Sequence, residues 1–403
     1  MVNVAVLGYG TVGSGVVEVI ETNKEMVNKK SGQELHVKYI LDLKDFPGDP
    51  YADRVVHDFN EIIQDEEIRI ICETMGGVGV AYQFTKTALK KGISVCTSNK
   101  ELVAKHGPEL LRIAKEHQCN YLFEASVGGG IPIIRPLNYS LTAEKIEAIT
   151  GILNGTTNYI LTKMEQEGAD FETVLKEAQA KGYAERNPEA DVEGHDACRK
   201  IAILSSLMTG MNVDSEKIYT EGITHVTADD FLYAKAAGKT IKLLAKSVAG
   251  KQGEVLAMVA PFMISRENPL AMVNDVYNAV LVTGNMLGDS MYYGRGAGKL
   301  PTASAVVSDV IDCARHLGKV IMCFWEEQDA RLAEVSQVEN AFYVRVKADF
   351  QAAALKEFAG ASVVELPGRT QDAALFTCPM KEADFQAACD KLGDAIESHI
   401  RLD

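Results

Sequence analysis

Acidic residues crowd around a single lysine in the segment GYAERNPEADVEGHDACRK, residues 182–200. From Gly194 onward the pattern is helical, so Asp196 and Lys200 are expected one turn apart on the same helix face. As a solvated ion pair they would contribute only about 0.3–0.5 kcal/mol. The apolar residues that follow Lys200 favour a different interpretation, in which the lysine enters a cleft.

A lysine in such a cleft could exchange a proton with a substrate oxygen. Burial lowers the pKa of a lysine ammonium and a neighbouring carboxylate raises it, which leaves a group able to donate or accept a proton during carbonyl reduction. Glu185 and Asp191 could then hold the ammonium group of an amino-acid substrate. The segment therefore predicts a proton-transfer centre that acts on a small amino-acid alcohol or aldehyde.

A glycine-rich turn near the start of the chain indicates where a nucleotide would bind. In GYGTVGSG, Gly8, Gly10 and Gly13 have the G-x-G-x-x-G spacing, directly after an apolar strand and before a helix. The three glycines would allow a tight turn, backbone approach to a pyrophosphate and close helix packing, while the N–H groups of Thr11 and Val12 face the anion. The context favours dinucleotide binding over a merely tight turn.

Two further residues lie at the carboxyl ends of predicted parallel strands, where α/β sheets bind ligands. Asp42 could accept hydrogen bonds from an adenosine ribose, which favours NAD over NADP, or it could be a solvent-facing turn acid. Lys44 could instead meet a 2′-phosphate, so the cofactor preference stays open. Lys100 ends the segment SVCTSNK, where the alternative is an ordinary surface lysine.

The elements that position these residues divide the chain into several parts. The first 130 residues alternate β-rich and helical runs, which predicts a doubly wound parallel sheet of an α/β protein. Later strands with Gly, Asn and Asp turns predict an antiparallel sheet, and the helix in TASAVVSDVIDCARHLG is expected to return to the first domain. We expect a dinucleotide-binding domain at 1–132 plus about 303–325, a catalytic and dimerisation domain at 133–302, a linker at 326–340 and a βαββαβ unit at 341–403.

The composition excludes several functional classes. A chain of 403 residues with 47% hydrophobic residues is an ordinary globular protein, and its net charge of −15 argues against non-specific binding to nucleic acid or anionic membranes. There is no apolar run long enough to span a bilayer, and MVNVAVLG begins as a strand rather than a secretion signal. Eight scattered cysteines without C-x-x-C pairs indicate reduced thiols in a cytoplasmic protein.

From residue 1 to about residue 325 the chain resembles homoserine dehydrogenases. The most specific match is AKGYAERNPEADVEGHDACRK, which carries the family pattern at Asn187, Pro188, Asp191, Gly194, Asp196 and Lys200. Other matching stretches are TSNKELVAKHG, FEASVGGGIPIIRPL, GILNGTTNYILTKM and YYGRGAGKLPTASAVVSDV. The resemblance implies reversible reduction of L-aspartate 4-semialdehyde to L-homoserine with NAD or NADP, on a Rossmann-type domain joined to an α+β catalytic domain.

The resemblance also implies roles for individual residues. Lys200 would be the general acid/base with Asp196 beside it, and Lys100 would stand where substrate and nicotinamide meet. The residues expected to bind the substrate are Glu185, Asp191, Thr156 and Lys100. The expected cofactor-binding residues are Gly8, Gly10, Thr11, Val12, Gly13, Asp42, Thr74, Ser98, Lys100 and Gly298.

A cation loop and the subunit association are implied in the same way. FEASVGGGI resembles the family's monovalent-cation loop, where the Glu124 side chain and the carbonyls of Val127, Gly129 and Ile131 would surround a structural sodium ion. A homodimer or homotetramer is expected.

Two departures from the family pattern leave properties open. Many relatives carry an arginine where this chain has Leu41, so NADP preference is not implied. Residues 341–403 have the element order of a regulatory ACT domain but are short and lack the D-x-P-G turn, which leaves inhibition by threonine undecided.

Two alternatives are weighed against this hypothesis. Aspartate-semialdehyde dehydrogenase needs a cysteine nucleophile, but helical spacing turns Cys198 away from the face of Asp196 and Lys200. A non-catalytic amino-acid sensor on the same fold would not need the intact set of lysine and acids.

Overall fold

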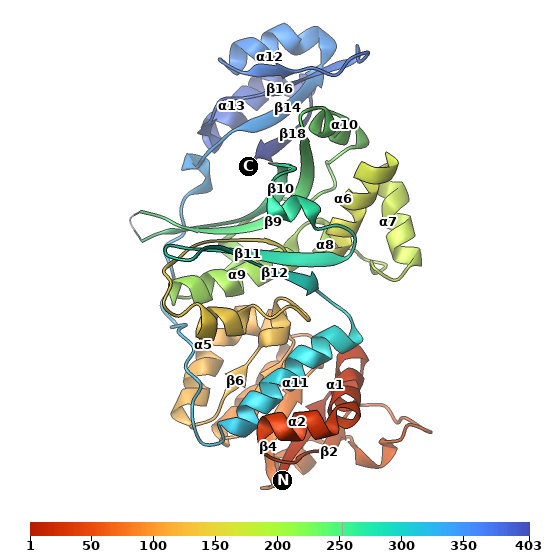
Figure 1. Ribbon diagram of the computed structural model, residues 1–403, viewed down its shortest axis with the longest axis vertical. Helices are drawn as coiled ribbons and strands as arrows, with labels where there is room; N and C mark the ends of the chain where they lie inside the picture. Colours follow the sequence, from red (N-terminus) through yellow and green to blue (C-terminus); the bar gives the residue numbers. More distant parts are fainter. Residues whose placement is uncertain (252) are drawn as a thin grey trace.

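The computed structural model describes residues 1–251 and 253–403. Figure 1 shows an elongated molecule in which the N-terminal sheet, a central sheet and the C-terminal segment follow one another along the longest axis. The region near the N-terminus is one end of the molecule, and helix α12 (Gln351–Glu357) lies at the other.

The N-terminal unit is built on six parallel strands. They are β1 (Val2–Leu7), β2 (Leu35–Leu41), β3 (Val55–Val56), β4 (Ile68–Glu73), β5 (Ser94–Thr97) and β6 (Tyr121–Leu122), in the order β3-β2-β1-β4-β5-β6. Strands β1 and β5 are buried along their whole length, as expected for a sheet covered by helices on both faces. The order reverses between β1 and β4, which is the arrangement of a Rossmann fold and confirms the predicted doubly wound sheet.

The helices of this unit connect successive strands. They are α1 (Thr11–Thr22), α2 (Lys24–Ser31), α3 (Phe59–Ile63), α4 (Gly79–Lys90) and α5 (Lys100–Glu116). The helical segment after the glycine-rich turn is interrupted at Asn23, which is the C-cap of α1 and the N-cap of α2.

Helix α11 (Lys299–Arg315) returns to the N-terminal unit from far along the chain and lies beside α1 and α2 in Figure 1. Its apolar residues Ala303, Val306 and Val310 share a buried cluster with Val16 and Val17 of α1. The two helices approach so closely that a side chain at Gly15 would lie 3.0 Å from the Ala303 methyl group.

The central sheet contains β7 (Ile146–Ile152), β9 (Lys239–Ala249), β10 (Val255–Ser265), β11 (Tyr277–Gly284) and β12 (Gly288–Arg295), which pair antiparallel in the order β12-β11-β7-β9-β10. The predicted antiparallel sheet is present in these five strands, but β8 (Tyr219–Thr220) and β18 (Ile396–Leu402) both pair parallel to β10. The sheet is therefore mixed.

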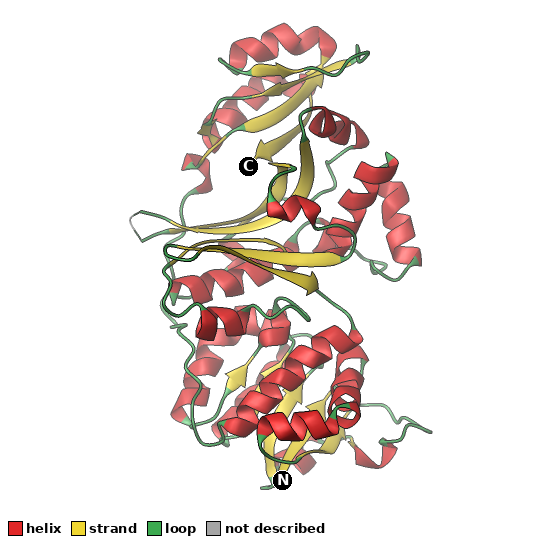
Figure 2. Ribbon diagram, viewed as in Figure 1, coloured by secondary structure: helices red, strands yellow, loops and turns green. Residues whose placement is uncertain are grey.

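Helices cover the central sheet on the side that faces the N-terminal unit and at one end, as Figure 2 shows. They are α6 (Gly155–Glu167), α7 (Phe171–Ala180), α8 (Glu189–Val192), α9 (His195–Thr209) and α10 (Ala228–Ala236). Helix α9 packs against β9 and β10 and also against α5, so it joins the central sheet to the N-terminal unit.

The C-terminal segment continues the central sheet instead of forming a separate one. Strands β14 (Phe342–Lys347), β15 (Ser362–Val364) and β16 (Asp372–Phe376) extend it in the order β18-β14-β16-β15, with α12 and α13 (Glu382–Leu392) as connections, and β13 (Glu339–Asn340) pairs with β17 (Met380–Lys381). The buried Arg345 fixes this segment to α10 through Asp230 at 2.9 Å, and it also pairs with Asp372 at 3.1 Å.

The segment before β13 lies along the central unit. Asn212 bridges to Asp329 and Val255 bridges to Leu332. The expected linker at 326–340 is thus attached to its neighbours over part of its length. In the described part of the chain, all eight cysteines are free thiols and no helix is both long and apolar enough to cross a membrane.

Candidate active site

Asp196 lies between two lysine ammonium groups. Its Oδ2 is 2.8 Å from Nζ of Lys200, one turn along α9, and its Oδ1 is 2.8 Å from Nζ of Lys100, the first residue of α5. Asp196 and Lys200 are only 5% and 8% exposed, whereas the Lys100 side chain is 38% exposed. The structure therefore brings together the three residues that the sequence suggested for proton transfer.

The charges of this trio stabilise one another. Burial raises the pKa of Asp196, but attraction to Lys200 and Lys100 outweighs it and holds that pKa well below its usual range. Burial lowers the pKa of Lys100, and the charge of Asp196 and its hydrogen bond more than offset this, so the pKa lies above the ordinary value. Asp196 is thus ionised, and Lys100 is cationic, at neutral pH.

Asn154 orders the acids around the lysine, although the sequence-based prediction does not include it. Its Nδ2 donates to Asp191 Oδ1 at 2.7 Å and to Asp196 Oδ2 at 2.9 Å. Its Oδ1 caps α6 by accepting from the Thr157 N–H at 2.9 Å. The only signal in the sequence is an asparagine followed by Gly-Thr-Thr, a helix N-cap pattern that says nothing about the acids it meets.

Lys200 is fixed from a second direction by the short segment between β7 and α6. Its Nζ donates to the Leu153 carbonyl at 2.8 Å, in addition to Asp196. An ammonium group has three protons, so one remains for a bound substrate.

The expected substrate-binding residues differ in how close they lie to this centre. Asp191 joins it through Asn154, and burial followed by repulsion from Asp196 raises the Asp191 pKa. Thr156 is buried and donates to the Tyr183 carbonyl at 2.7 Å, which fixes the loop after α7. Glu185 is exposed in that loop, and among the described residues no hydrogen bond joins its carboxylate to the lysine centre.

The glycine-rich turn has the geometry expected of a phosphate-binding loop. Gly8 has a φ of +88°, and a side chain on Gly13 would lie 1.8 Å from the Gly8 carbonyl oxygen. A Cβ on Gly10 would meet no atom within 4 Å. Gly10 caps α1, so the N–H groups of Thr11 and Val12 belong to the first turn of that helix and are available to an anion.

The other expected cofactor residues surround this turn. The Thr74 hydroxyl, half-buried, donates to the Leu7 and Gly8 carbonyls, at 2.9 Å each, and so builds the turn itself. Asp42 accepts from the Tyr9 N–H at 2.8 Å. Gly298 precedes α11 with a φ of +119°, and Ser98 lies half-buried after β5.

Glu73, a residue missing from the sequence-based prediction, fixes the loops after β4 and β5. It is completely buried, and its two oxygens accept from the Met75 N–H at 2.9 Å and the Thr97 hydroxyl at 2.6 Å. Burial raises the pKa of this carboxyl. The sequence shows only an acid at the end of an apolar strand. It gives no sign of this role, because the contact with Thr97 forms only in the folded protein.

Glu124 begins the loop expected to hold a cation. Its buried carboxylate accepts the N–H groups of Ile133, Ile134 and Arg135 at 2.6, 2.9 and 2.7 Å. Burial raises its pKa, although these N–H groups oppose that effect. In the described chain no group of three or more His, Cys, Asp or Glu residues could hold a metal ion, so any cation here would depend on backbone carbonyls.

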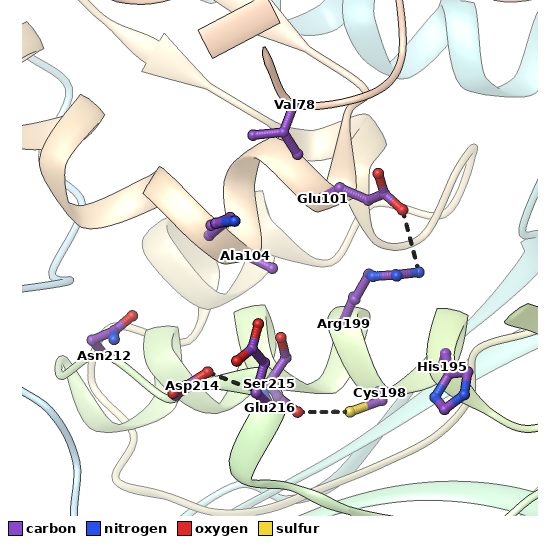
Figure 3. Close-up of a pocket in the computed structure, with 11 residues that line it drawn as sticks. Val78, Glu101, Ala104, His195, Cys198, Arg199, Asn212, Asp214, Ser215 and Glu216 are labelled. Carbon is purple, nitrogen blue, oxygen red and sulfur yellow. Dashed lines mark hydrogen bonds and ion pairs between the residues drawn. The ribbon is translucent and has the colours of Figure 1, made fainter.

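A cavity of about 730 Å³ lies between α5 and α9 and is lined by residues of both helices (Figure 3). Arg199 and Glu101 form an ion pair across it at 3.3 Å. Cys198 lines this cavity and donates to the Ser215 carbonyl at 3.3 Å. Lys100, Asp196 and Lys200 are not among the residues that line this cavity, which agrees with the helical spacing that turns Cys198 away from Asp196 and Lys200.

Comparisons with known proteins agree with this geometry. Residues 8–124 match the family model of the homoserine dehydrogenase NAD-binding domain, and residues 132–311 match that of homoserine dehydrogenase. The homoserine dehydrogenase of Synechocystis sp. is 47% identical over 315 residues, which cover 77% of this chain and 73% of that protein.

Solved structures show the same likeness. A homoserine dehydrogenase from Thiobacillus denitrificans superposes with a TM-score of 0.91 at 36% identity, over 100% of this chain and 98% of that one. A hyperthermophilic archaeal homoserine dehydrogenase in complex with NADPH has a TM-score of 0.63 at 30% identity, over 77% of this chain and 97% of that one.

Proposed function

This chain belongs to the homoserine dehydrogenase family, and we propose from that membership how its residues carry out the family's reaction. It catalyses the reversible NAD(P)H-dependent reduction of L-aspartate 4-semialdehyde to L-homoserine, a step in the biosynthesis of threonine, methionine and isoleucine. The observation that carries the residue assignment is the position of Asp196 between Lys100 and Lys200.

Lys200 is the general acid/base of the proposed mechanism. The bound nicotinamide supplies the hydride that reaches the aldehyde carbon. As negative charge develops on the aldehyde oxygen, Lys200 donates its remaining proton to that oxygen, and in the reverse direction it takes the proton back from the alcohol. Asp196 orients both ammonium groups, and the charge of Lys100 adds to the stabilisation of the developing alkoxide.

The acids around this centre bind the polar end of the substrate. Asp191, held by Asn154, is placed to accept hydrogen bonds from the substrate ammonium or hydroxyl group. Glu185 reaches the same substrate from the loop that Thr156 fixes through the Tyr183 carbonyl. The excess of acids over lysines on this side suits an amino-acid substrate, whose ammonium group needs carboxylate partners.

The glycine-rich turn holds the cofactor pyrophosphate. The residues fit that group, because the open space at Gly10 lets the backbone approach it and the N–H groups of Thr11 and Val12 face it. Gly8 and Gly13 form the turn, Asp42 lies at the ribose, and Thr74, Ser98 and Gly298 border the cleft.

A sodium ion bound by the 124–131 loop would supply structural rigidity. The donor chemistry fits a monovalent cation, because the proposed ligands are one buried carboxylate and backbone carbonyls, all of them hard oxygen donors. Glu124 and the carbonyls of Val127, Gly129 and Ile131 are the proposed ligands.

We assign residues 1–132 with about 303–325 to cofactor binding, 133–302 to catalysis and dimerisation, and 341–403 to a truncated ACT-like domain. The strand order β18-β14-β16-β15 with two helices supports the last assignment. A homodimer or homotetramer is supported by β12, an edge strand of the large sheet that exposes Met291 and Tyr293 beside the exposed turn residues Met286 and Leu287.

Steady-state oxidation of L-homoserine tests this function. The purified protein is assayed with NAD and with NADP, each with and without threonine. Cofactor reduction that depends on homoserine, and reversal by aspartate semialdehyde, is the expected result. Absence of turnover with both cofactors would contradict the proposal. The assays with threonine show whether the enzyme responds to that amino acid.

A further inference from the structure

The Asp42 carboxylate is fixed directly beside the glycine-rich turn. It follows β2, and its Oδ2 accepts the Tyr9 N–H at 2.8 Å while its Oδ1 accepts the Lys44 N–H at 3.0 Å. Each oxygen keeps a second lone pair for a ligand. In a Rossmann sheet an acid at the end of this strand is where the adenosine ribose of the cofactor binds.

Tyr9 anchors the loop that follows Asp42. Its hydroxyl lies 3.2 Å from both carboxylate oxygens of Asp49, and its ring packs edge-on against Phe46 with centroids 4.9 Å apart. Burial, and then the charge of Asp49, raises the pKa of Tyr9 to about 12, so the hydroxyl stays a donor. The loop therefore keeps Asp42 in place, and it carries Asp45 and Asp49 as further negative charges.

Two of the basic side chains near this loop already have partners other than the Asp42 carboxylate. Arg54 pairs with Glu21 at 2.8 Å and donates to the Val37 carbonyl at 3.1 Å. His57 contacts the Asp42 carbonyl at 2.7 Å and the Asp45 carboxylate at 3.1 Å. Lys44 is the one basic residue in the sequence from 42 to 51, and it is exposed.

We propose that Asp42 makes this enzyme select NAD(H) over NADP(H). The inference rests on the proposed cofactor site. A ribose 2′-hydroxyl donates a hydrogen bond to the carboxylate, whereas a 2′-phosphate has no proton to donate there and places like charges together. Because like charges placed together at an interface weaken binding, NADPH should bind about 100-fold more weakly than NADH.

Equilibrium titration of NADH and NADPH, followed by cofactor fluorescence, tests this selectivity without turnover. The wild-type protein should show the difference in Kd, and Asp42→Asn should reduce it by at least about tenfold by removing the repelling charge. Asn keeps an acceptor for the Tyr9 N–H, and a thermal unfolding midpoint near that of the wild type shows that this variant is folded.

Two variants locate the effect. Asp45→Asn removes the same charge from the same loop and should change the Kd ratio by less than about threefold, because Asp45 does not lie at the ribose position. Lys44→Ala should leave NADPH affinity unchanged within the same limit. Wild-type preference for NADPH, an equal effect of Asp45→Asn, or a large loss of NADPH affinity in Lys44→Ala would each overturn the inference.

Equal affinity for the two cofactors would overturn the selectivity while leaving the proposed function in place. Failure of both cofactors to bind would overturn both, because the nucleotide site itself would then be wrong.

Discussion

Nζ of Lys100 lies 2.8 Å from Oδ1 of Asp196, and this contact joins the N-terminal unit to the central unit at the candidate active site. Lys100 begins α5 and Asp196 lies in the first turn of α9, so each helix contributes one partner. The other oxygen of Asp196 holds Lys200. The lysine that we propose as general acid/base is therefore positioned by a carboxylate whose own position depends on how the two units pack.

Asn154→Ala should lower kcat by about tenfold, because Asp191 and Asp196 would lose the amide that separates and orients them. The same substitution removes the α6 cap, which should cost about 1 kcal/mol of stability. Urea unfolding measures the second effect and steady-state kinetics the first. Asn268→Ala removes a cap from the short helical turn at 269–272 and serves as a control that should leave kcat unchanged. Equal kcat losses in the two variants would assign the effect to stability alone.

Gly10→Ala and Gly13→Ala should separate cofactor binding from folding. A methyl group on Gly10 meets only open space, so the variant should fold normally but bind NADH at least about tenfold more weakly, because the methyl group enters the pyrophosphate position. A methyl group on Gly13 would overlap the Gly8 carbonyl oxygen, so that variant should be destabilised. Calorimetry for stability and titration for affinity distinguish the two. Wild-type cofactor affinity in folded Gly10→Ala would contradict the proposed pyrophosphate site.

Lys242 should make stability rise with pH above about 8. Its side chain is completely buried, and burial lowers its pKa to about 8, against 10.5 in an unfolded chain. Below pH 8 the lysine is charged in both states. Between 8 and 10.5 the unfolded chain binds more protons, so unfolding becomes less favourable, by up to about 3 kcal/mol over that window.

Urea unfolding of the wild type and of Lys242→Met at pH 7.5 and pH 10.5 isolates this effect. Other groups titrate in both proteins, so the difference between the two free energies of unfolding reports Lys242. That difference should move in favour of the wild type at the higher pH. A constant difference would show that the lysine keeps its ordinary pKa.

Features set by short-range sequence patterns were predictable. The pairing of Asp196 with Lys200 follows from a spacing of four residues on one helix, and the glycine-rich turn follows from its position between a strand and a helix. The parallel order of the first sheet follows from the alternation of strands and helices. In each case the structure is determined by a residue spacing or a turn within a short stretch of the sequence.

Features that depend on tertiary packing were not predictable. The contact of Lys100 with Asp196 joins distant segments, and Asn154 has no more than a helix-cap signal in the sequence. Strand β9 was missed because three lysines interrupt its apolar pattern. One of them, Lys242, is buried in the fold and donates to the Val273 carbonyl at 2.6 Å. The parallel pairing of β18 with β10 likewise has no local signal.

The most direct test of the central claim compares kcat of wild type and Lys200→Met in homoserine oxidation. Methionine is also unbranched and only one atom shorter than lysine, and it has no exchangeable proton to donate. We expect kcat to fall by about 10³-fold and the Kd for NADH to stay unchanged. Lys163→Met serves as the control and should remain active, because Lys163 pairs with Glu167 on α6 and not with the lysine centre. Turnover of Lys200→Met near the wild-type rate would contradict the assignment of Lys200 as the proton donor.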